Sequence, residues 1–236
     1  MIEVDKICKQ VDTAEGTLHI LDDISLSLPS GETLAIVGPS GSGKSTLLGI
    51  LAGLDIPSSG SVKLGGRDIT EMDEEGRAEV RSKDVGFVFQ SFHLLPGLTA
   101  LENVALPLEL NNDSKALETA HYYLERVGLQ HRTTHYPRQL SGGEQQRVAV
   151  ARAFACKPTI LFADEPTGNL DTVTGEIINN LLFDLNREEG TTLVLVTHEM
   201  NLAARCNRTL VLEAGRQSSN DVIDQALVNA IASHAH

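Results

Sequence analysis

The sequence lacks the features that mark membrane-spanning and exported chains. Its 236 residues include no tryptophan and only three cysteines, and no uninterrupted apolar run reaches eighteen residues. A transmembrane helix needs about 20 apolar residues, so we expect no segment to cross a bilayer, and any membrane role would need a partner chain. The stretch MIEVDKICKQ lacks a charged-then-apolar signal architecture, so we expect no signal peptide.

The cysteines and the charge exclude further classes of protein. Cys8, Cys156 and Cys206 are widely spaced and fit neither a zinc motif nor a redox motif, which favours reduced thiols in a cytosol. The formal net charge of −13 argues against a nucleic-acid partner and against attachment to anionic lipid by charge alone. The length is sufficient for one or two domains with a buried core.

The hydrophobic periodicity predicts an α/β fold. Alternating residues predict antiparallel strands over 1–11 and 18–28 and an edge strand over 61–66. Short apolar runs predict buried strands over 32–38, 85–90, 159–164, 191–198 and 208–215. Helical spacing predicts helices over 44–54, 72–84, 98–110, 114–129, 171–190 and 220–236, and one that begins at Ser141. Strands that alternate with helices imply a mainly parallel sheet covered on both faces, beside an N-terminal antiparallel β subdomain.

The helical stretch between the strands predicts an inserted subdomain. Thr99 with Glu102, and Ser141 with Glu144, have the capping-box spacing that begins a helix. We therefore expect a single domain over 1–236. Residues 1–90 and 157–236 would form its α/β core, and 91–156 an inserted α-helical subdomain.

The segment GPSGSGKST (38–46) predicts a phosphate site. It matches G-x-x-x-x-G-K-[ST], the P-loop pattern, between a predicted strand and a predicted helix. Glycines let backbone N–H groups curl around phosphate oxygens, Lys44 can reach the β- and γ-phosphates, and Ser45 offers a hydroxyl to Mg²⁺. The full motif in this context disfavours the alternative, a glycine loop that merely turns a strand into a helix. The candidate cofactor-binding residues here are Gly38, Pro39, Ser40, Gly41, Ser42, Gly43, Lys44, Ser45 and Thr46.

Polar residues stand at the carboxyl ends of three of the predicted strands. A carboxylate at the tip of a buried strand, here Asp164, can hold Mg²⁺, and the next residue, Glu165, can polarise an attacking water. Gln90 and His198 also end buried strands, where ligands collect in open α/β sheets. A lone Gln or His in such a place is more often a turn residue, but the P-loop favours contacts with the γ-phosphate and water. We predict Glu165, His198 and Gln90 as catalytic, and Ser45, Gln90 and Asp164 as metal ligands.

The stretch LSGGEQQRVAVARA (140–153) places two glycines in the first turn of a predicted helix. A helix N-terminus without side chains is a patch of N–H groups that favours anions. The ordered set GPSGSGKST, Gln90, LSGGEQQ, LFADEPTGNLD and His198 resembles the ATP-binding cassette proteins, the nucleotide-binding subunits of ABC transporters, over about residues 2–215. The resemblance implies a P-loop NTPase (RecA-like) core that binds ATP and Mg²⁺ and hydrolyses ATP.

The same resemblance implies partners. Family members dimerise head to tail, so Ser141, Gly142 and Gly143 would touch the γ-phosphate held by a second copy, with Asp171 between the two sites. The resemblance also implies that ATP hydrolysis drives a membrane permease, in export, extraction or mechanotransmission, and that the chain lies at the cytoplasmic face of the inner membrane. VGFVFQSFHLLPGLTALENVALPL and ADEPTGNLD resemble the lipoprotein-release and macrolide-export branch, whose permeases carry a large periplasmic domain. MDEE, LNREEGTT and LAARC narrow the likeness to one type of ATPase subunit.

Two other functions remain as alternatives. Soluble cassette ATPases that act without a permease, on DNA or ribosomes, usually carry coiled-coil insertions or tandem cassettes, and this chain has neither. A GTPase or small-molecule kinase would not explain LSGGE, and the sequence has no N-K-x-D base-reading motif. One position departs from the family pattern, because Val11 stands where an aromatic residue usually stacks on adenine.

Overall fold

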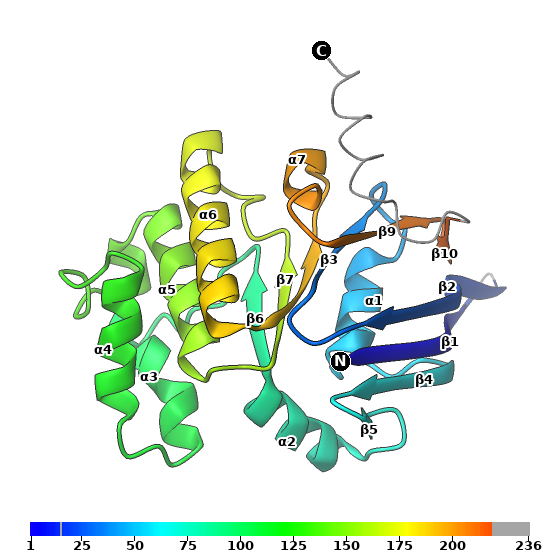
Figure 1. Ribbon diagram of the computed structural model, residues 1–236, viewed down its shortest axis with the longest axis horizontal. Helices are drawn as coiled ribbons and strands as arrows, with labels where there is room; N and C mark the ends of the chain where they lie inside the picture. The colour runs from blue at the N-terminus through cyan, green and yellow to red at the C-terminus, as the bar shows by residue number, and fades with distance from the viewer. Residues whose placement is uncertain (15, 219–236) are drawn as a thin grey trace. The chain divides into compact units, whose positions relative to one another are not determined.

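The computed structural model describes residues 1–14 and 16–218, which form two compact units (Figure 1). Among the described residues, the first unit comprises 1–14, 16–81 and 192–218, and the second comprises Ser82–Thr191. The predicted helical stretch 91–156 falls within the second unit, which also takes in strands and a further helix. The helix expected over 220–236 lies outside the described residues.

The N-terminal part of the first unit is an antiparallel sheet. Strand β1 (Ile2–Thr13) pairs with β2 (Gly16–Leu28) on one side and with β4 (Ser59–Leu64) on the other, which confirms the antiparallel subdomain. The prediction of an edge strand over 61–66 is wrong, because β5 (Arg67–Asp68) pairs with β4 and occupies the edge. A strand of two residues is too short to produce a periodic signal.

The rest of the first unit is built on parallel strands. Strand β3 (Thr33–Val37) lies between β8 (Thr192–Val196) and β9 (Arg208–Glu213) and is parallel to both. All five residues of β3 and all five of β8 are buried, as expected for strands covered on both faces. Helix α1 (Lys44–Leu51) contacts β8, and α7 (Met200–Ala203) contacts β3. The short β10 (Arg216–Gln217) runs antiparallel to β9.

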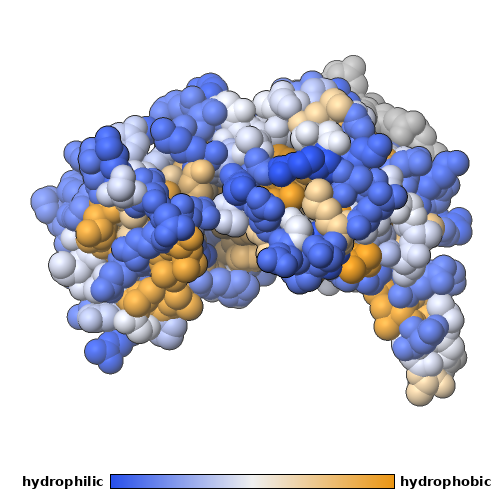
Figure 2. Space-filling model, turned by 90° about the horizontal axis from the view of Figure 1, so that it is seen from below, coloured by the Kyte–Doolittle hydropathy of each residue, from blue (hydrophilic) through white to orange (hydrophobic). Residues whose placement is uncertain are grey.

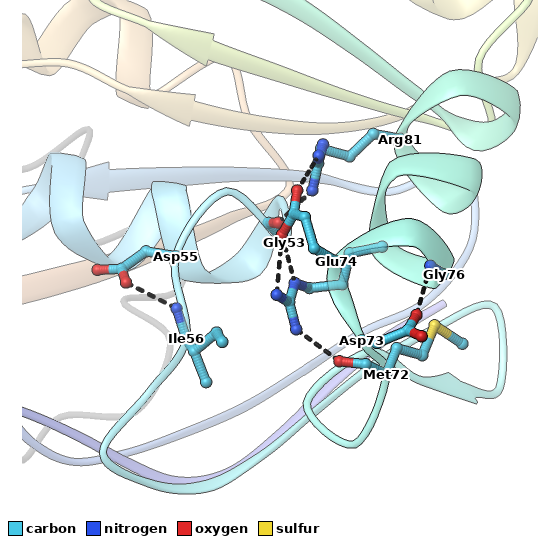
Figure 3. A network of polar contacts seen from close by, with 9 residues as sticks. Gly53, Asp55, Ile56, Met72, Asp73, Glu74, Gly76 and Arg81 are labelled. Atoms are coloured by element: carbon cyan, nitrogen blue, oxygen red, sulfur yellow. Dashed lines mark hydrogen bonds and ion pairs between the residues drawn. The ribbon is translucent and has the colours of Figure 1, made fainter.

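A network of polar contacts, made of ion pairs within helix α2 (Glu74–Asp84) and a hydrogen bond from Arg81 to a backbone carbonyl, joins the helix to the loop after α1, as Figure 3 shows. Arg81 donates to the carbonyl oxygen of Gly53 and to Oε1 of Glu74, each at 2.6 Å. Arg77, which is buried, donates from Nη2 to Oε2 of Glu74 at 2.8 Å. Hydrogen bonds from Arg81 and Arg77 lower the pKa of Glu74. These side chains fix where α2 begins relative to the end of α1.

The second unit combines two parallel strands with four α-helices. Its elements are β6 (Val85–Phe89), α3 (Ala100–Leu110), α4 (Ala116–Arg126), the 3₁₀ turn η1 (Pro137–Gln139), α5 (Gly142–Ala155), β7 (Ile160–Asp164) and α6 (Thr172–Glu189). Helices α3, α4 and α5 contact one another, and α5 also contacts β6 and α6 (Figure 1). Tyr123, Phe154 and Phe162 are among its largest fully buried side chains. Helix α5 is therefore central to this unit.

The helix starts follow the sequence signals. Thr99 and Ser141 both form complete capping boxes, with Glu102 and Glu144 respectively, as their spacing predicts. Asn103, in the first turns of α3, is 1% exposed and holds the preceding loop. Its Nδ2 donates to the carbonyl oxygens of Leu95, Leu98 and Thr99 at 3.1, 3.0 and 2.9 Å, and its Oδ1 accepts from the amide of Leu95 at 2.8 Å.

We predict that Asn103→Ala lowers the free energy of unfolding by about 2 kcal/mol, because the loop before α3 loses the four hydrogen bonds that this buried side chain makes with its backbone. Urea unfolding followed by circular dichroism measures the change. Gln130→Ala, at an exposed loop position, is the control and is expected to change stability by less than about 0.5 kcal/mol. Equal stabilities for the two variants would contradict this role for Asn103.

Candidate functional site

The loop between β3 and α1 packs so closely against the backbones of β2 and β9 that two of its glycines have no room for a side chain. Gly38 has φ 152° and Gly43 has φ 99°. A Cβ atom on Gly38 would lie 2.1 Å from the carbonyl oxygen of Leu212, and one on Gly43 would lie 2.9 Å from that of Ile20. The amide of Gly215 also donates to the carbonyl oxygen of Ser42 at 3.1 Å. The backbones on either side therefore fix the curl of the loop.

The chemistry of this loop fits a phosphate group. Helix α1 begins without a side-chain cap and without an acidic residue in its first turn. Lys44 is 8% exposed, and its ammonium group donates to the carbonyl oxygens of Gly38 and Pro39 at 2.9 and 2.8 Å, neither of which carries a full negative charge. The hydroxyl oxygen of Ser42 is buried and has no hydrogen-bond partner within residues 1–14 and 16–218. A buried cation, an uncapped helix N-terminus and an orphaned hydroxyl together suit an anion.

His198 lies at the same edge of the first unit's parallel strands as this loop. In the register of β3 with β8, Ile36 is paired with Val196. Gly38 lies two residues after Ile36 in β3, and His198 lies two residues after Val196 in β8. The amide of Thr197 donates to the carbonyl oxygen of Ile36 at 3.2 Å, which continues the alignment beyond β8. The side chains of Ser45, at the start of α1, and of His198, after β8, are both exposed, and the segments that carry them follow neighbouring strands.

The second unit brings Gln90 and Glu165 together. Phe89 is paired with Asp164 at the carboxyl ends of β6 and β7, so the next residues of both strands lie side by side. A Cβ on Gly168 would lie 2.7 Å from Nε2 of Gln90 and 3.3 Å from Oε2 of Glu165. Gln90 Nε2 donates to Asn169 Oδ1 at 3.2 Å, and Asn169 Nδ2 donates to the carbonyl oxygen of Gln90 at 3.0 Å.

Glu165 adopts an unusual backbone conformation. Its φ is +43°, in the left-handed region that costs non-glycine residues energy and is found often at functional sites. The amide of Gly168 donates to the carbonyl oxygen of Glu165 at 3.0 Å and closes a turn with Pro166 at its second position. The chain therefore turns directly after Asp164 and Glu165, at the carboxyl end of β7.

The segment Ser141–Gly143 begins helix α5, as predicted. Ser141 Oγ accepts from the amide of Glu144 at 3.2 Å, and Glu144 Oε2 accepts from the amide of Ser141 at 2.8 Å. The hydrogen bond from the Ser141 amide lowers the pKa of Glu144, and Arg132, whose Nε lies 3.0 Å from Glu144 Oε1, contributes further. A lowered pKa means that this stabilisation is present above the ordinary pKa of a glutamate and is lost as the pH falls through the lowered value.

The two glycines of this helix start have different structural reasons. Gly143 is buried, and a Cβ there would lie 2.4 Å from Cγ2 of Thr174 in α6. A Cβ on Gly142 would lie 3.3 Å from Cδ2 of Leu170, which a small shift could relieve. The close packing of α5 on α6 therefore requires glycine at 143 whatever the helix N-terminus binds, a requirement that the sequence pattern does not reveal.

Comparisons with known proteins decide the family. A family model described as ABC transporter matches residues 21–168. The chain is 58% identical over 218 residues to the ABC transporter ATP-binding protein YbbA of Escherichia coli K12, covering 92% of this chain and 96% of that one. It is 48% identical to the lipoprotein-releasing system ATP-binding protein LolD of Shewanella oneidensis, over 91% and 94% of the two chains. This chain belongs to the ABC transporter family.

The solved structures agree. The ATP-binding cassette MJ0796, in a dimeric post-hydrolysis state bound to ADP and Pi, superposes with a TM-score of 0.87 at 39% identity, covering 95% of this chain and 99% of that chain. A second dimeric MJ0796 structure gives 0.86 at 42% identity, covering 92% and 97%. The α/β P-loop fold, the ATPase family and the narrower likeness to one subunit type are thereby confirmed. The protein is an ATP-binding subunit of the ABC transporter family.

Two residues of the cassette that the sequence did not single out support these loops. Arg152 in α5 donates to the carbonyl oxygens of His93 and Phe92 at 2.7 and 3.0 Å, and burial lowers the pKa of its guanidinium group. Phe92 and His93 both have positive φ, so Arg152 holds an unfavourable conformation in the loop after Gln90. The second residue is Gln146, which contacts both strand-end loops. Both act on backbone carbonyls, which leave no trace in the sequence.

We predict that Gly143→Ala lowers the free energy of unfolding of the cassette by about 1–3 kcal/mol, since the new methyl group overlaps Thr174. Adding Thr174→Ser removes the overlapping Cγ2 and leaves Cβ at 3.8 Å, so the double variant is expected to regain most of the loss. Gly142→Ala is the matched control and should cost less. Denaturant unfolding of the four proteins gives the comparison, and a double variant no more stable than Gly143→Ala would refute the packing explanation.

Proposed function

We propose that this chain dimerises around two ATP molecules and that ATP hydrolysis in the dimer drives a membrane permease. The observation that carries the proposal is the chemistry of the loop before α1, where Lys44 is buried and the hydroxyl of Ser42 has no hydrogen-bond partner among the described residues. The neighbouring cassette MJ0796, 39% identical, is dimeric and bound to ADP and Pi, which supports the same nucleotide chemistry here.

The residues from Gly38 to Thr46 would bind the phosphates of ATP. Lys44 would exchange its two carbonyl partners for phosphate oxygens, and the amides at the start of α1 would donate to the same anion. Mg²⁺ would be held by the hydroxyl of Ser45, the carboxylate of Asp164 and the oxygen Oε1 of Gln90, whose Nε2 is already engaged by Asn169. When bound, the ion neutralises charge on the phosphates.

Glu165 would act as the general base. Its carboxylate would accept a proton from the attacking water, and Gln90 and His198 would orient that water and the γ-phosphate. The left-handed backbone at Glu165 supports this role, because strain of this kind persists only where the surrounding structure fixes it.

The start of α5 would complete the site of a second copy. The capping box engages the amides of Ser141 and Glu144, so the amides of Gly142 and Gly143 remain as the donors for an anion. The pair of glycines keeps side chains out of their way. Ser141, Gly142 and Gly143 would then contact the γ-phosphate held by the partner's P-loop, with Asp171, the N-cap of α6, between the two sites.

The permease would meet the helical subdomain, 91–156. In the segment after Gln90, Leu95 is 46% exposed although Ala100 and Val104 are buried, so the segment is part core and part surface. Figure 2 shows hydrophobic residues on the surface of the second unit as well as of the first. None of the helices within 1–14 and 16–218 is long and apolar enough to cross a bilayer, so contact with a permease would be peripheral.

The relatives favour one class of permease. LolD is named as the ATP-binding protein of a lipoprotein-releasing system. The sequence resemblance to that branch implies a permease with a large periplasmic domain, and we propose such a partner here and a place for the chain at the cytoplasmic face of the inner membrane. Copurification with such a permease is the test that separates this function from a cassette ATPase that acts without one.

We predict that Glu165→Gln lowers kcat for ATP hydrolysis by about 10²–10⁴ and leaves ATP binding intact, because the base is lost but the phosphate loop is not. Size-exclusion chromatography with ATP and Mg²⁺ should then show a stable dimer. Lys44→Ala is the contrasting variant: it should neither hydrolyse ATP nor form that dimer. Monomeric elution of Glu165→Gln with hydrolysis intact would count against the assignment.

We also predict that two inactive variants complement each other. Lys44→Ala has a defective phosphate loop, and Ser141→Arg has a helix start blocked by bulk. If Ser141 acts on the partner's nucleotide, a mixed dimer concentrates both faults in one site and leaves the other intact. Vanadate should therefore trap one nucleotide per mixed dimer and none in either parent. Absence of trapping, once subunit exchange is verified, would show that the glycine pair does not serve the partner's site.

A further inference from the structure

We infer that Gln146, in the second turn of α5, is a positioning residue that aligns the loops carrying Gln90 and Glu165. This inference rests on the proposed function, because it assumes that these two side chains act on ATP and its attacking water. All three residues belong to the second unit. Gln146 itself would contact neither nucleotide nor metal.

One amide group joins the two strand-end loops. Gln146 Nε2 donates to the carbonyl oxygen of Pro166 at 2.6 Å and, more weakly, to that of Phe89 at 3.4 Å. Phe89 immediately precedes Gln90, and Pro166 immediately follows Glu165. Since the side chain of Gln146 is 0% exposed, water does not compete for these hydrogen bonds.

The loop after β7 needs this donor. Pro166 is buried and lies inside the turn closed between Glu165 and Gly168. A buried carbonyl group without a donor destabilises the conformation that holds it. The adjacent Glu165 has the unfavourable φ of +43°, so loss of the hydrogen bond allows the turn to relax and moves the carboxylate.

The oxygen Oε1 of the Gln146 amide shows that the position is occupied by glutamine because of its donor, Nε2. Gln146 Oε1 is buried and has no hydrogen-bond partner in the described part of the chain. An aliphatic side chain of similar length would avoid that penalty if the position served packing alone. Rotating the amide would place Oε1 against two carbonyl oxygens, so the orientation is determined. The free-energy cost of the buried Oε1 is offset by the hydrogen bonds that Nε2 donates to the carbonyl oxygens of Pro166 and Phe89.

The helix that carries Gln146 begins at Ser141. Gln146 lies little more than one helical turn from the segment proposed to contact the partner's nucleotide. A displacement of the start of α5 therefore reaches the Glu165 loop through one short hydrogen bond. This provides a route by which closure of the second copy onto α5 aligns the base of the same chain.

The test compares two substitutions at position 146. Gln146→Met keeps the length of the side chain and removes the donor. Gln146→Glu keeps the shape and places a carboxylate oxygen opposite two carbonyl oxygens. We expect kcat of the purified full chain to fall about tenfold in the first and about a hundredfold in the second, since small displacements of a reacting group cost this much. The dissociation constant of a fluorescent ATP analogue, measured by titration, is expected to stay within about twofold of the wild-type value, because the phosphate loop is unchanged.

Asn186→Leu is the matched control. Asn186 is 5% exposed, and its Nδ2 donates to the carbonyl oxygen of Thr191 at 2.6 Å, so it loses a hydrogen bond of the same kind at the end of α6. We expect a similar loss of thermal stability and an unchanged kcat. If Asn186→Leu loses kcat as Gln146→Met does, or if both Gln146 variants keep the wild-type kcat, the positioning role is overturned. Should Gln146→Glu fail to fold, Gln146→Met decides alone.

Two further variants separate this inference from the function on which it rests. Lys44→Ala and Glu165→Gln are measured in the same assay. Wild-type hydrolysis in these variants would overturn the proposed function itself. Inactive Lys44→Ala and Glu165→Gln beside fully active Gln146 variants would overturn only the role of Gln146.

Discussion

The close approach of backbone to backbone around the glycine loop is the constraint on which the first unit depends. The carbonyl oxygen of Leu212 occupies the place of a side chain on Gly38, and that of Ile20 the place of one on Gly43. The loop therefore fits only where strands far apart in the sequence are in register. Once they are, the loop brings Lys44 to the uncapped start of α1. The proposed anion site therefore depends on the assembly of the sheet and not on the motif alone.

The treatment of helix ends explains how a chain with a net charge of −13 can bind a polyanion. Helices α3, α5 and α6 have side-chain caps, from Thr99, Ser141 and Asp171, each of which accepts from one first-turn amide, and at α5 the cap leaves the amides of Gly142 and Gly143 uncapped. Helix α1 has none and no acid in its first turn. Charges farther away than about 8–10 Å are largely screened at physiological salt. Local amides and Lys44 therefore outweigh the acidic surface.

The sequence predicts the fold well where periodicity and motif agree, and less well where chain segments meet. Buried strands such as β3 and β8, and the helix starts at Thr99 and Ser141, follow from local patterns. The two-residue β5 is too short to leave a periodic pattern, so the sequence does not reveal that β5, and not β4, lies at the edge of the sheet. Around the candidate site, the family resemblance supplies the candidate residues and the role expected of each. The contact of Gly143 with Thr174 could not, because it depends on how two helices pack.

Helix α5 shows how one element can serve folding and chemistry together. Its start is a capping box, and its Gly143 permits contact with α6. Its buried Gln146 and half-buried Arg152 hold backbone carbonyls of the loops after β6 and β7. Each of these loops contains residues with positive φ, which neighbouring groups must stabilise. A helix that is rigid along its length conveys a displacement at one end to both loops. The chemistry attributed to Gln90 and Glu165 therefore depends on a helix whose own residues, beyond its first turn, never need to touch the nucleotide.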